Sequence, residues 1–250
     1  MHVNSACRWL VNKTNLDYVE YVARTASVSL PLAQVMINRG LKTADQIYAF
    51  LYPSIDRLSD PFDLPDMQKA VYRIRRAQQN RERVLICGDY DADGISATAI
   101  LLETFSMLGI EADFFLPHRL EHGYGFGLAG VDRAKAIGAS LIVTVDCGIS
   151  AFDVVHAARD AGIDVLITDH HEAVGDESGD GDICYRLPAA IAVVNPKLLR
   201  DDVQVKGLCG AGVAFKLAQA LFNNKIDDIY HLFDLVAIGT TADVVPLVGD

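Results

Sequence analysis

From residue 84 onward, short apolar runs alternate with segments whose apolar residues recur at helical spacing. Short runs rich in β-branched and aliphatic residues predict strands, and apolar positions three and four apart predict helices. The expected order is strand 84–88, helix 95–108, strand 112–116, helix 129–137, strand 140–145, helix 151–161, strand 163–168, strand 190–195, helix 211–222 and helix 226–238. This alternation predicts an α/β fold with a mostly parallel β-sheet flanked by helices.

The first 80 residues have a different pattern. Helical stretches such as "LPLAQVMINRG" and "ADQIYAFL" are followed by "YPSIDRLSDPFDLPD", whose three prolines and four aspartates indicate an irregular connection. We therefore expect a helical N-terminal extension over residues 1–80 and an α/β domain over residues 81–250.

Three aspartates, Asp89, Asp91 and Asp93, directly follow the first predicted strand. Carboxylates this close repel one another unless a cation lies among them. A calcium-binding EF-hand is excluded, because such a loop follows a helix and carries Glu at its twelfth position, where this chain has Ile100. The alternative is a turn whose aspartates only cap the next helix.

Further acids and histidines follow other apolar segments. Asp146 ends one strand, Asp169, His170 and His171 end the next, and Asp243 follows the last helix. Singly, each has a structural explanation, such as a helix cap or a core histidine. Because the carboxyl ends of parallel strands share one sheet edge, the group together predicts a metal site.

The residue types also suggest which ions bind there. A pair of divalent cations is the usual arrangement for phosphoryl displacement, and such a pair needs a bridging carboxylate, for which Asp146 is the candidate. Mixed imidazole and carboxylate ligands favour two Mn²⁺ ions over Mg²⁺, although Mg²⁺ is not excluded.

The overall charge restricts the partners. With 33 acidic and 22 basic residues, the chain has a net charge of −11, so a polyanion would need local basic patches or bound metal. The segment 69–83 carries six basic residues and one acid, and is equally consistent with a nucleic-acid contact and a solvated helix face. The five cysteines form no C-x-x-C pair, and neither a signal peptide nor a membrane segment is evident, so we expect a cytoplasmic protein without a membrane partner.

Two loops offer possible substrate contacts. "PHRLEHGYGFG" places Arg119, His122 and Tyr124 among glycines after a strand, which suits a substrate-facing loop or a plain hairpin. "KGLCGAGVAFKLAQ" has glycines before a helix but matches no phosphate-binding motif, so close packing is the favoured interpretation and anion binding the alternative.

The segments "DYDADG", "VDCG", "DHH" and "GTTADVVPL", in this order, resemble the four motifs of the DHH phosphoesterase superfamily, and within it the bacterial RecJ family of single-stranded-DNA exonucleases. The resemblance implies a two-manganese nuclease that degrades single-stranded DNA in the 5′ to 3′ direction in recombination and DNA repair. It also implies other repair or replication proteins as possible partners. The implied metal ligands are Asp89, Asp91, Asp93, Asp146, His170 and Asp243. The implied catalytic residues are Asp91, Asp93, Asp146, His170 and His171.

The resemblance leaves alternatives open. Other members of the superfamily act on short oligonucleotides, cyclic dinucleotides or pyrophosphate, and some RecJ relatives are non-catalytic components of replication complexes. Family members also have a C-terminal substrate-binding domain, which we expect to be absent from this chain. Whether the chain is a fragment, and what polarity and processivity it has, are left open by the sequence.

Overall fold

The computed structural model describes residues 14–118, 125–177, 183–199, 204–247 and 249–250. The chain forms two compact units, residues 1–58 (the N-terminal unit) and residues 59–250 (the sheet unit). The division precedes the boundary expected near residue 80, because helix α4 (Met67–Asn80) packs against the strand β7 (Ala192–Val194) and helix α8 (Gly210–Leu221) of the sheet unit. Among the described residues, no helix has both the length and the apolar character to cross a membrane.

The N-terminal unit consists of three short helices, α1 (Leu16–Thr25), α2 (Leu30–Asn38) and α3 (Ala44–Leu51), followed by a 3₁₀ turn, η1 (Ile55–Arg57). A reciprocal capping box fixes the start of α3: Gln46 N–H donates to the Thr43 hydroxyl, and the Gln46 side chain accepts from Thr43 N–H. The core of the unit is aliphatic and consists of Val19, Val22, Ala23, Ala26, Ala33, Met36 and Ile47.

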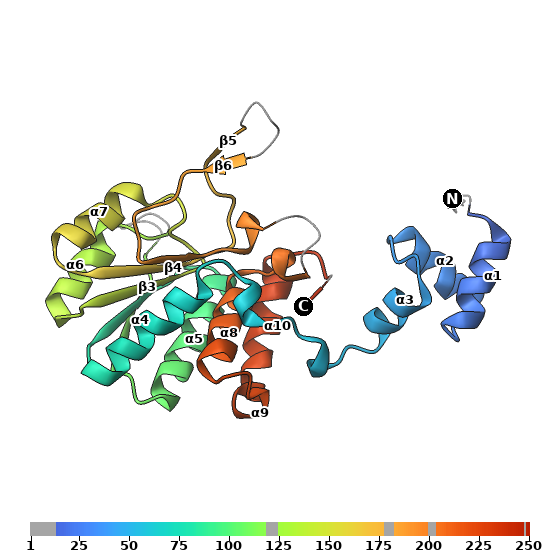
Figure 1. The fold of residues 1–250 in the computed structure, drawn as a ribbon, viewed down its shortest axis with the longest axis horizontal. Coiled ribbons are helices and arrows are strands. Elements are labelled where there is room, and N and C mark those ends of the chain that lie inside the picture. Colours follow the sequence, from blue (N-terminus) through green and yellow to red (C-terminus); the bar gives the residue numbers. More distant parts are fainter. Residues whose placement is uncertain (1–13, 119–124, 178–182, 200–203, 248) are drawn as a thin grey trace, which may run out of the picture. The chain divides into compact units, whose positions relative to one another are not determined.

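A five-stranded parallel sheet forms the centre of the sheet unit (Figure 1). Its order is β2 (Ala112–Phe115), β1 (Val84–Cys87), β3 (Leu141–Val145), β4 (Asp164–Thr168) and β7. Every residue of β1 and β3 is buried, as their continuous apolar runs predict for strands covered on both faces. The predicted α/β fold with a parallel sheet is confirmed.

Helices cover both faces of this sheet (Figure 1). Helices α6 (Leu128–Ile137) and α7 (Phe152–Asp160) pack on one face, over an apolar cluster that includes Leu85, Ile142 and Ile167. Helices α4, α5 (Ala92–Met107) and α8 lie on the other face, and α10 (Phe233–Ala242) packs against α5 and α8.

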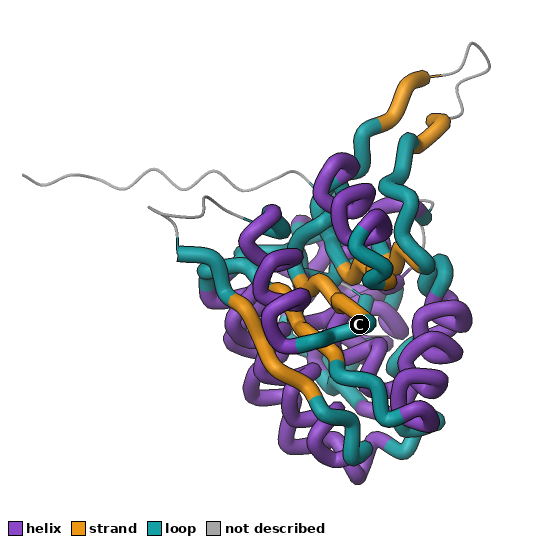
Figure 2. The backbone as a smooth tube through the Cα atoms, turned by 90° about the vertical axis from the view of Figure 1, so that its left-hand side faces the viewer, coloured by secondary structure: helices purple, strands orange, loops and turns teal. Residues whose placement is uncertain are grey.

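Two segments differ from the sequence-based expectation. Between β4 and β7, where the expected order has no element, lies a small antiparallel hairpin of β5 (Gly175–Glu177) and β6 (Ile183–Tyr185), which projects away from the sheet (Figure 2). The single helix expected over residues 226–238 is divided into α9 (Ile226–Ile229), a 3₁₀ turn η5 (Tyr230–Leu232) and α10. Helix α10 continues to Ala242, so Asp243 is its C-terminal cap.

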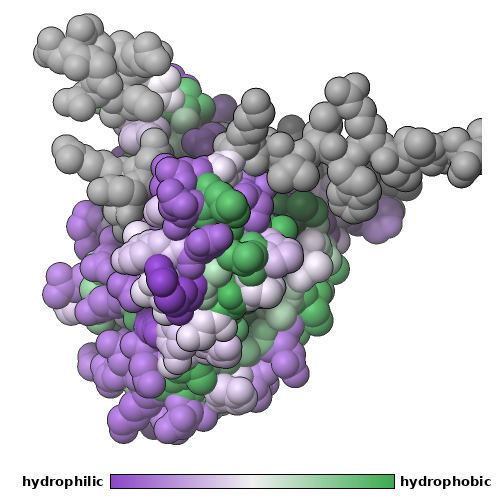
Figure 3. All heavy atoms as spheres, turned by 90° about the vertical axis from the view of Figure 1, so that its right-hand side faces the viewer, coloured by the Kyte–Doolittle hydropathy of each residue, from purple (hydrophilic) through white to green (hydrophobic). Residues whose placement is uncertain are grey.

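The surface of the molecule mixes polar and apolar side chains (Figure 3). Large apolar residues with more than half of their surface exposed include Leu16, Tyr48, Tyr72, Ile238 and Val244.

Candidate metal centre

The candidate site lies at the carboxyl edge of the sheet, where β1 and β3 are neighbours. From β1 the chain continues outward to β2, whereas from β3 it continues to β4 on the other side. Open α/β sheets bind their ligands at such a reversal of strand order, because the loops leaving the two strands diverge there. The loops after β1, β3 and β4 carry the predicted acids and histidines.

Asp93, in the first turn of α5, is buried and joins two helices. Its two carboxylate oxygens accept hydrogen bonds from the backbone N–H groups of Gly210 (2.6 Å) and Ala211 (2.8 Å) at the start of α8. The positive end of the α8 dipole favours a carboxylate at this place. Asp93 is therefore held rigidly at the centre of the site.

Two glycines allow this close approach. A Cβ atom on Gly210 would lie 2.6 Å from the Asp146 Cβ and 2.7 Å from its Oδ1, and a Cβ on Gly239 would overlap the Asp93 carboxylate. Gly210, from the glycine-rich stretch at the start of α8, therefore serves close packing around the acids, in line with the interpretation favoured from sequence.

Asp146 follows β3 in the left-handed backbone region, with a φ of 58°, which few residues other than Gly adopt. Its Oδ1 is fully buried and lies 3.0 Å from His170 Nε2, but it receives no hydrogen bond of acceptable geometry from the described residues. Burial raises the pKa of Asp146 to about 7, because His170 offsets only part of the lost hydration and Asp93 and Asp91 add like charge. A bound cation would remove this cost.

The His170 ring lies among three of the predicted acids. Its Nε2 lies 3.0 Å from Asp146 and 3.7 Å from Asp93, and its Nδ1 lies 3.8 Å from Asp243. Burial alone would lower the pKa of His170, but Asp146 beside it outweighs burial, and the net pKa is raised. The imidazole is thus shared by carboxylates from three different segments.

His171 is held by Asp169, an acid of the predicted cluster to which the sequence analysis gave no ligand or catalytic role. Its Nδ1 lies 2.7 Å from Asp169, a hydrogen bond that raises the pKa of His171 to about 9. Asp169 is buried and also accepts from the backbone N–H groups of Ile149, His170 and His171. Burial opposes its ionisation, but the contact with His171 and these N–H donors outweigh burial and lower its pKa.

Asn195, after β7, is a residue of the site that sequence reasoning missed. Its side chain is completely buried, donates to the His171 carbonyl (2.9 Å) and accepts from Lys197 N–H. Its position at the end of a strand on the same sheet edge is the only sequence signal that could have found it.

The structure brings some predicted ligands together and leaves others apart. Two groups have ligand atoms within 4.8 Å of one another, Asp146 with His170 and His171, and Asp93 with His170 and Asp243. In both, carboxylate oxygens combine with imidazole nitrogens, which is a donor set suited to Mn²⁺ and other divalent transition metals. The buried Oδ1 of Asp146, which receives no hydrogen bond of acceptable geometry from the described residues, supports a metal at this position.

Asp89 and Asp91 are in neither group. Asp91 is the N-cap of α5 and accepts from Gly94 N–H (2.9 Å), and Asp89 accepts from Tyr90 N–H (2.7 Å). Asp91 therefore caps α5, as the alternative interpretation expected. The ligand role of Asp89 and Asp91 stays a prediction.

The predicted substrate-contacting residues Arg119, His122 and Tyr124 lie outside the described residues. Much of the basic segment 69–83 is engaged inside the sheet unit. Arg73 is buried and pairs with Glu82 (2.7 Å) and Asp164 (2.6 Å), and Arg75 donates to a backbone carbonyl at the end of α8. These contacts favour a mainly structural role for the segment.

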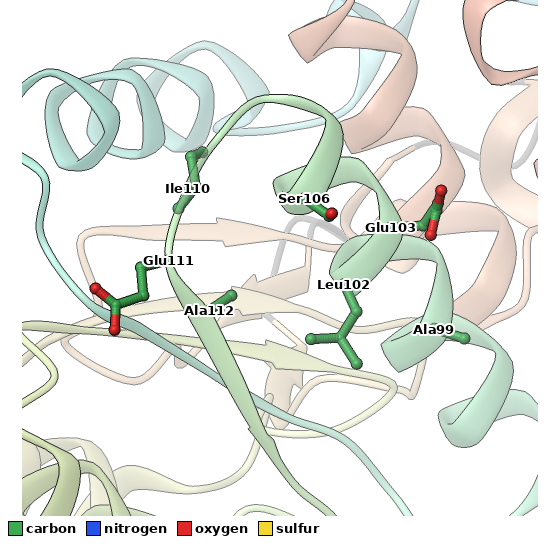
Figure 4. A pocket seen from close by; sticks show the side chains of 7 residues that line it. All are labelled: Ala99, Leu102, Glu103, Ser106, Ile110, Glu111 and Ala112. Carbon is green, nitrogen blue, oxygen red and sulfur yellow. The ribbon is translucent and has the colours of Figure 1, made fainter.

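A hollow of about 560 Å³ lies away from this site, between α5 and the start of β2 (Figure 4). Its lining residues are Ala99, Leu102, Glu103, Ser106, Ile110, Glu111 and Ala112. Since Ala112 is the first residue of β2, the hollow is at the amino edge of the sheet, opposite the candidate metal centre. Glu111 there pairs with Arg83, and the hollow offers no group of metal ligands among the described residues.

Comparison with known proteins agrees with this geometry. Residues 83–240 match the family model described as DHH family, N-terminal domain. The single-stranded-DNA-specific exonuclease RecJ of Bacillus subtilis (strain 168) is 39% identical over 243 residues, which are 97% of this chain and 29% of that protein.

Crystal structures of RecJ from Thermus thermophilus have the same fold. The complex with Mn²⁺ gives a TM-score of 0.71 at 29% identity, covering 94% of this chain and 32% of that one. The complex with Mg²⁺ gives a TM-score of 0.59 at 27% identity, covering 94% of this chain and 28% of that one. The chain thus spans less than a third of the length of these relatives.

Proposed function

The chain belongs to the DHH family, and from this premise we propose that it hydrolyses phosphodiester bonds in single-stranded DNA with the help of divalent metal ions. We further propose exonuclease action in the 5′ to 3′ direction during recombination and DNA repair in the cytoplasm. The observation that carries the proposal is the convergence of Asp93, Asp146 and Asp243 on His170, since such mixed ligand sets hold the metals of phosphodiesterases.

Each residue has a distinct part in this proposal. Asp93, Asp146, His170 and Asp243 would hold the cations, and His170 belongs to both ligand groups. Asp146 is the proposed bridging residue, because a carboxylate has two oxygens to offer two ions. Metal ions supply a polarised phosphate and an activated water in such sites. Asp169 occupies His171 Nδ1 and so orients that ring with its Nε2 as the nitrogen available to the site.

Two Mn²⁺ ions are the proposed cofactors, with Mg²⁺ as a weaker substitute. The imidazoles support this preference, because Mg²⁺ favours an all-oxygen octahedron and keeps its waters. Single-stranded DNA is the proposed substrate, and repair or replication proteins are proposed partners on the basis of the family alone.

The test is an incubation with labelled substrates. Single strands labelled at the 5′ or the 3′ end, a duplex and a dinucleotide would each be mixed with the chain and Mn²⁺, Mg²⁺ or a chelator. We expect Mn²⁺-dependent cleavage of single strands with release of the 5′ label first. Cleavage of the dinucleotide alone would instead assign the chain to the short-oligonucleotide phosphodiesterases, and binding without cleavage would indicate a non-catalytic factor.

Asp146→Asn is the matched loss-of-function variant. Asn keeps the size of Asp and tolerates the left-handed backbone, so the change removes the charge without straining the turn. Asp132→Asn is the control, since its side chain is exposed on α6 and its ion pair among the described residues is with Lys135 on the same helix. Equal cleavage by both variants would contradict the assignment of the site.

A further inference from the structure

Residues 14–58, the described part of the N-terminal unit, keep their aromatic side chains at the surface. The described part of the unit has five aromatic residues, and all of them are exposed: Tyr18, Tyr21, Tyr48, Phe50 and Tyr52. Its core is built from aliphatic side chains instead. In the sheet unit, by contrast, Phe105, Phe126 and Phe215 are buried. Aromatic rings are normally used for burial, so a set left wholly outside the core indicates a binding surface.

Two of these rings are arranged as a pair. Tyr48 and Tyr52, one helical turn apart at the end of α3, have ring centroids 4.8 Å apart and an interplanar angle of 40°. The guanidinium of Arg57, on the following turn, lies 5.5 Å from the centre of the Tyr48 ring, within cation–π distance. Tyr48 is 51% exposed and Tyr52 56% exposed, so both keep surface for a ligand. Tyr48, Tyr52 and Arg57 are called the tyrosine cluster below.

The charge of this unit also differs from that of the rest of the chain. Residues 1–58 contain six of the 22 basic residues and only four of the 33 acidic ones. The net charge of −11 therefore comes wholly from the sheet unit. A polyanion would meet less repulsion at the N-terminal unit than at the sheet unit.

We propose that the tyrosine cluster binds single-stranded nucleic acid by stacking bases on Tyr48 and Tyr52 while Arg57 faces the backbone phosphates. Paired aromatic rings beside a guanidinium are how proteins hold single strands without sequence preference, because every base presents a π face. The class of ligand rests on the proposed function. The cluster adds a second contact that belongs to a different unit from the metal centre and requires no metal.

Fluorescence anisotropy tests this inference on the full chain. A fluorescein-labelled oligothymidylate would be titrated in the presence of a chelator, which prevents cleavage. We expect Tyr48→Ala/Tyr52→Ala to weaken binding at least about fivefold, as the loss of base stacking predicts. Tyr48→Phe/Tyr52→Phe keeps both rings and should bind within about twofold of the unmodified chain.

Tyr72→Ala is the matched control, because Tyr72 is the most exposed tyrosine of the described chain, at 72%, and lies on α4 of the sheet unit. It should leave binding unchanged, and circular dichroism melting should confirm that all variants fold. The inference would be overturned if the alanine double variant bound as tightly as the unmodified chain, or if Tyr72→Ala weakened binding equally. A protein partner would then be the expected ligand of the exposed rings.

The same samples separate this inference from the proposed function. If the unmodified chain cleaves single strands with Mn²⁺ but the alanine double variant binds normally, only the tyrosine cluster is refuted. If the unmodified chain neither binds nor cleaves single strands, both proposals fail. Mn²⁺-dependent hydrolysis of a dinucleotide should be unchanged in the double variant, because such a substrate is too short to need a second contact.

Discussion

The N-terminal unit and the sheet unit use aromatic and acidic side chains in opposite ways. In the described part of the N-terminal unit the rings are exposed and the core is aliphatic, and the unit has few acids. In the sheet unit three acids, Asp93, Asp146 and Asp169, are buried at one edge of a sheet. Under our two proposals the buried carboxylates hold cations and the exposed rings hold bases, so bond cleavage and strand binding would be divided between the units.

The largest expected effect is on cleavage, and it comes from removing the charge of one buried acid of the sheet unit. Asp146→Asn should reduce Mn²⁺-dependent cleavage by more than about a hundredfold, because even residues that only support metal ligands cost about 10- to 100-fold when changed. Initial rates on a labelled single strand measure the effect, with Asp132→Asn as control. Retention of a tenth or more of the rate would show that Asp146 is dispensable.

A second variant tests the packing around the same acids. Gly210→Ala adds a methyl group where the Asp146 side chain lies 2.6 Å away, so it should displace that carboxylate and destabilise the sheet unit by about 1–3 kcal/mol. Cleavage should fall as well. Gly127→Ala is the control, because a Cβ there meets no atom within 4 Å. Urea unfolding and cleavage rates measure both effects, and equal stability of the two variants would count against tight packing at Gly210.

Metal binding should stabilise one unit and not the other. At about 100 times its dissociation constant, one bound ion adds about 2.7 kcal/mol, which raises the melting temperature of a unit of this size by about 5–10 °C. Hydrogen exchange with and without Mn²⁺ should show added protection around β1, β3 and β4 and none in α1 to α3. Equal added protection in both units would contradict the assignment of metal binding to the sheet unit alone.

The smallest expected effect concerns Glu82, which pairs with Arg73 far from the metal centre. Burial of Glu82 opposes its ionisation, but hydrogen bonds from Ser140, Asn80 and Arg73 outweigh burial and lower its pKa to about 2. A pKa below that of the unfolded chain stabilises the folded state above pH 4.5 and loses that contribution as the pH falls toward 2.

Because solvent screens a partly exposed ion pair, Glu82→Gln should remove only about 1 kcal/mol of stability at pH 7, and progressively less below about pH 4.5. Urea unfolding at several pH values measures this dependence. Glu103→Gln, an exposed change on α5, is the control. A pH-independent effect of Glu82→Gln would contradict the pairing with Arg73.

The sequence predicted the sheet and the residues at its carboxyl edge because both follow from local patterns. Apolar runs identified β1, β3 and β4, and parallel strands necessarily bring their carboxyl ends together. Asp93, Asp146 and His170 could therefore be assigned to one place before any coordinates were known, whereas Asp243 follows a helix and its ligand role came from the family resemblance. The same reasoning also assigned Asp89 and Asp91, which local hydrogen bonds hold outside both ligand groups.

Contacts between distant segments could not be predicted in this way. The hydrogen bonds from Gly210 and Ala211 to Asp93 depend on how α8 crosses α5, and the Asn195 contact with His171 depends on where β7 ends. The left-handed backbone of Asp146 has no sequence signal either, since Asp adopts it only occasionally. The structural role of Arg73 also became visible only with its partners Glu82 and Asp164 in place.

Isothermal calorimetry of Mn²⁺ binding tests the central claim, that acids from three strand ends and from α10 form one metal centre. We expect about two ions per chain, as for other two-metal phosphodiesterases, and loss of both in Asp146→Asn because a bridging ligand serves each ion. Asp132→Asn should bind as the unmodified chain does. Binding of two ions by Asp146→Asn with unchanged affinity would contradict the account.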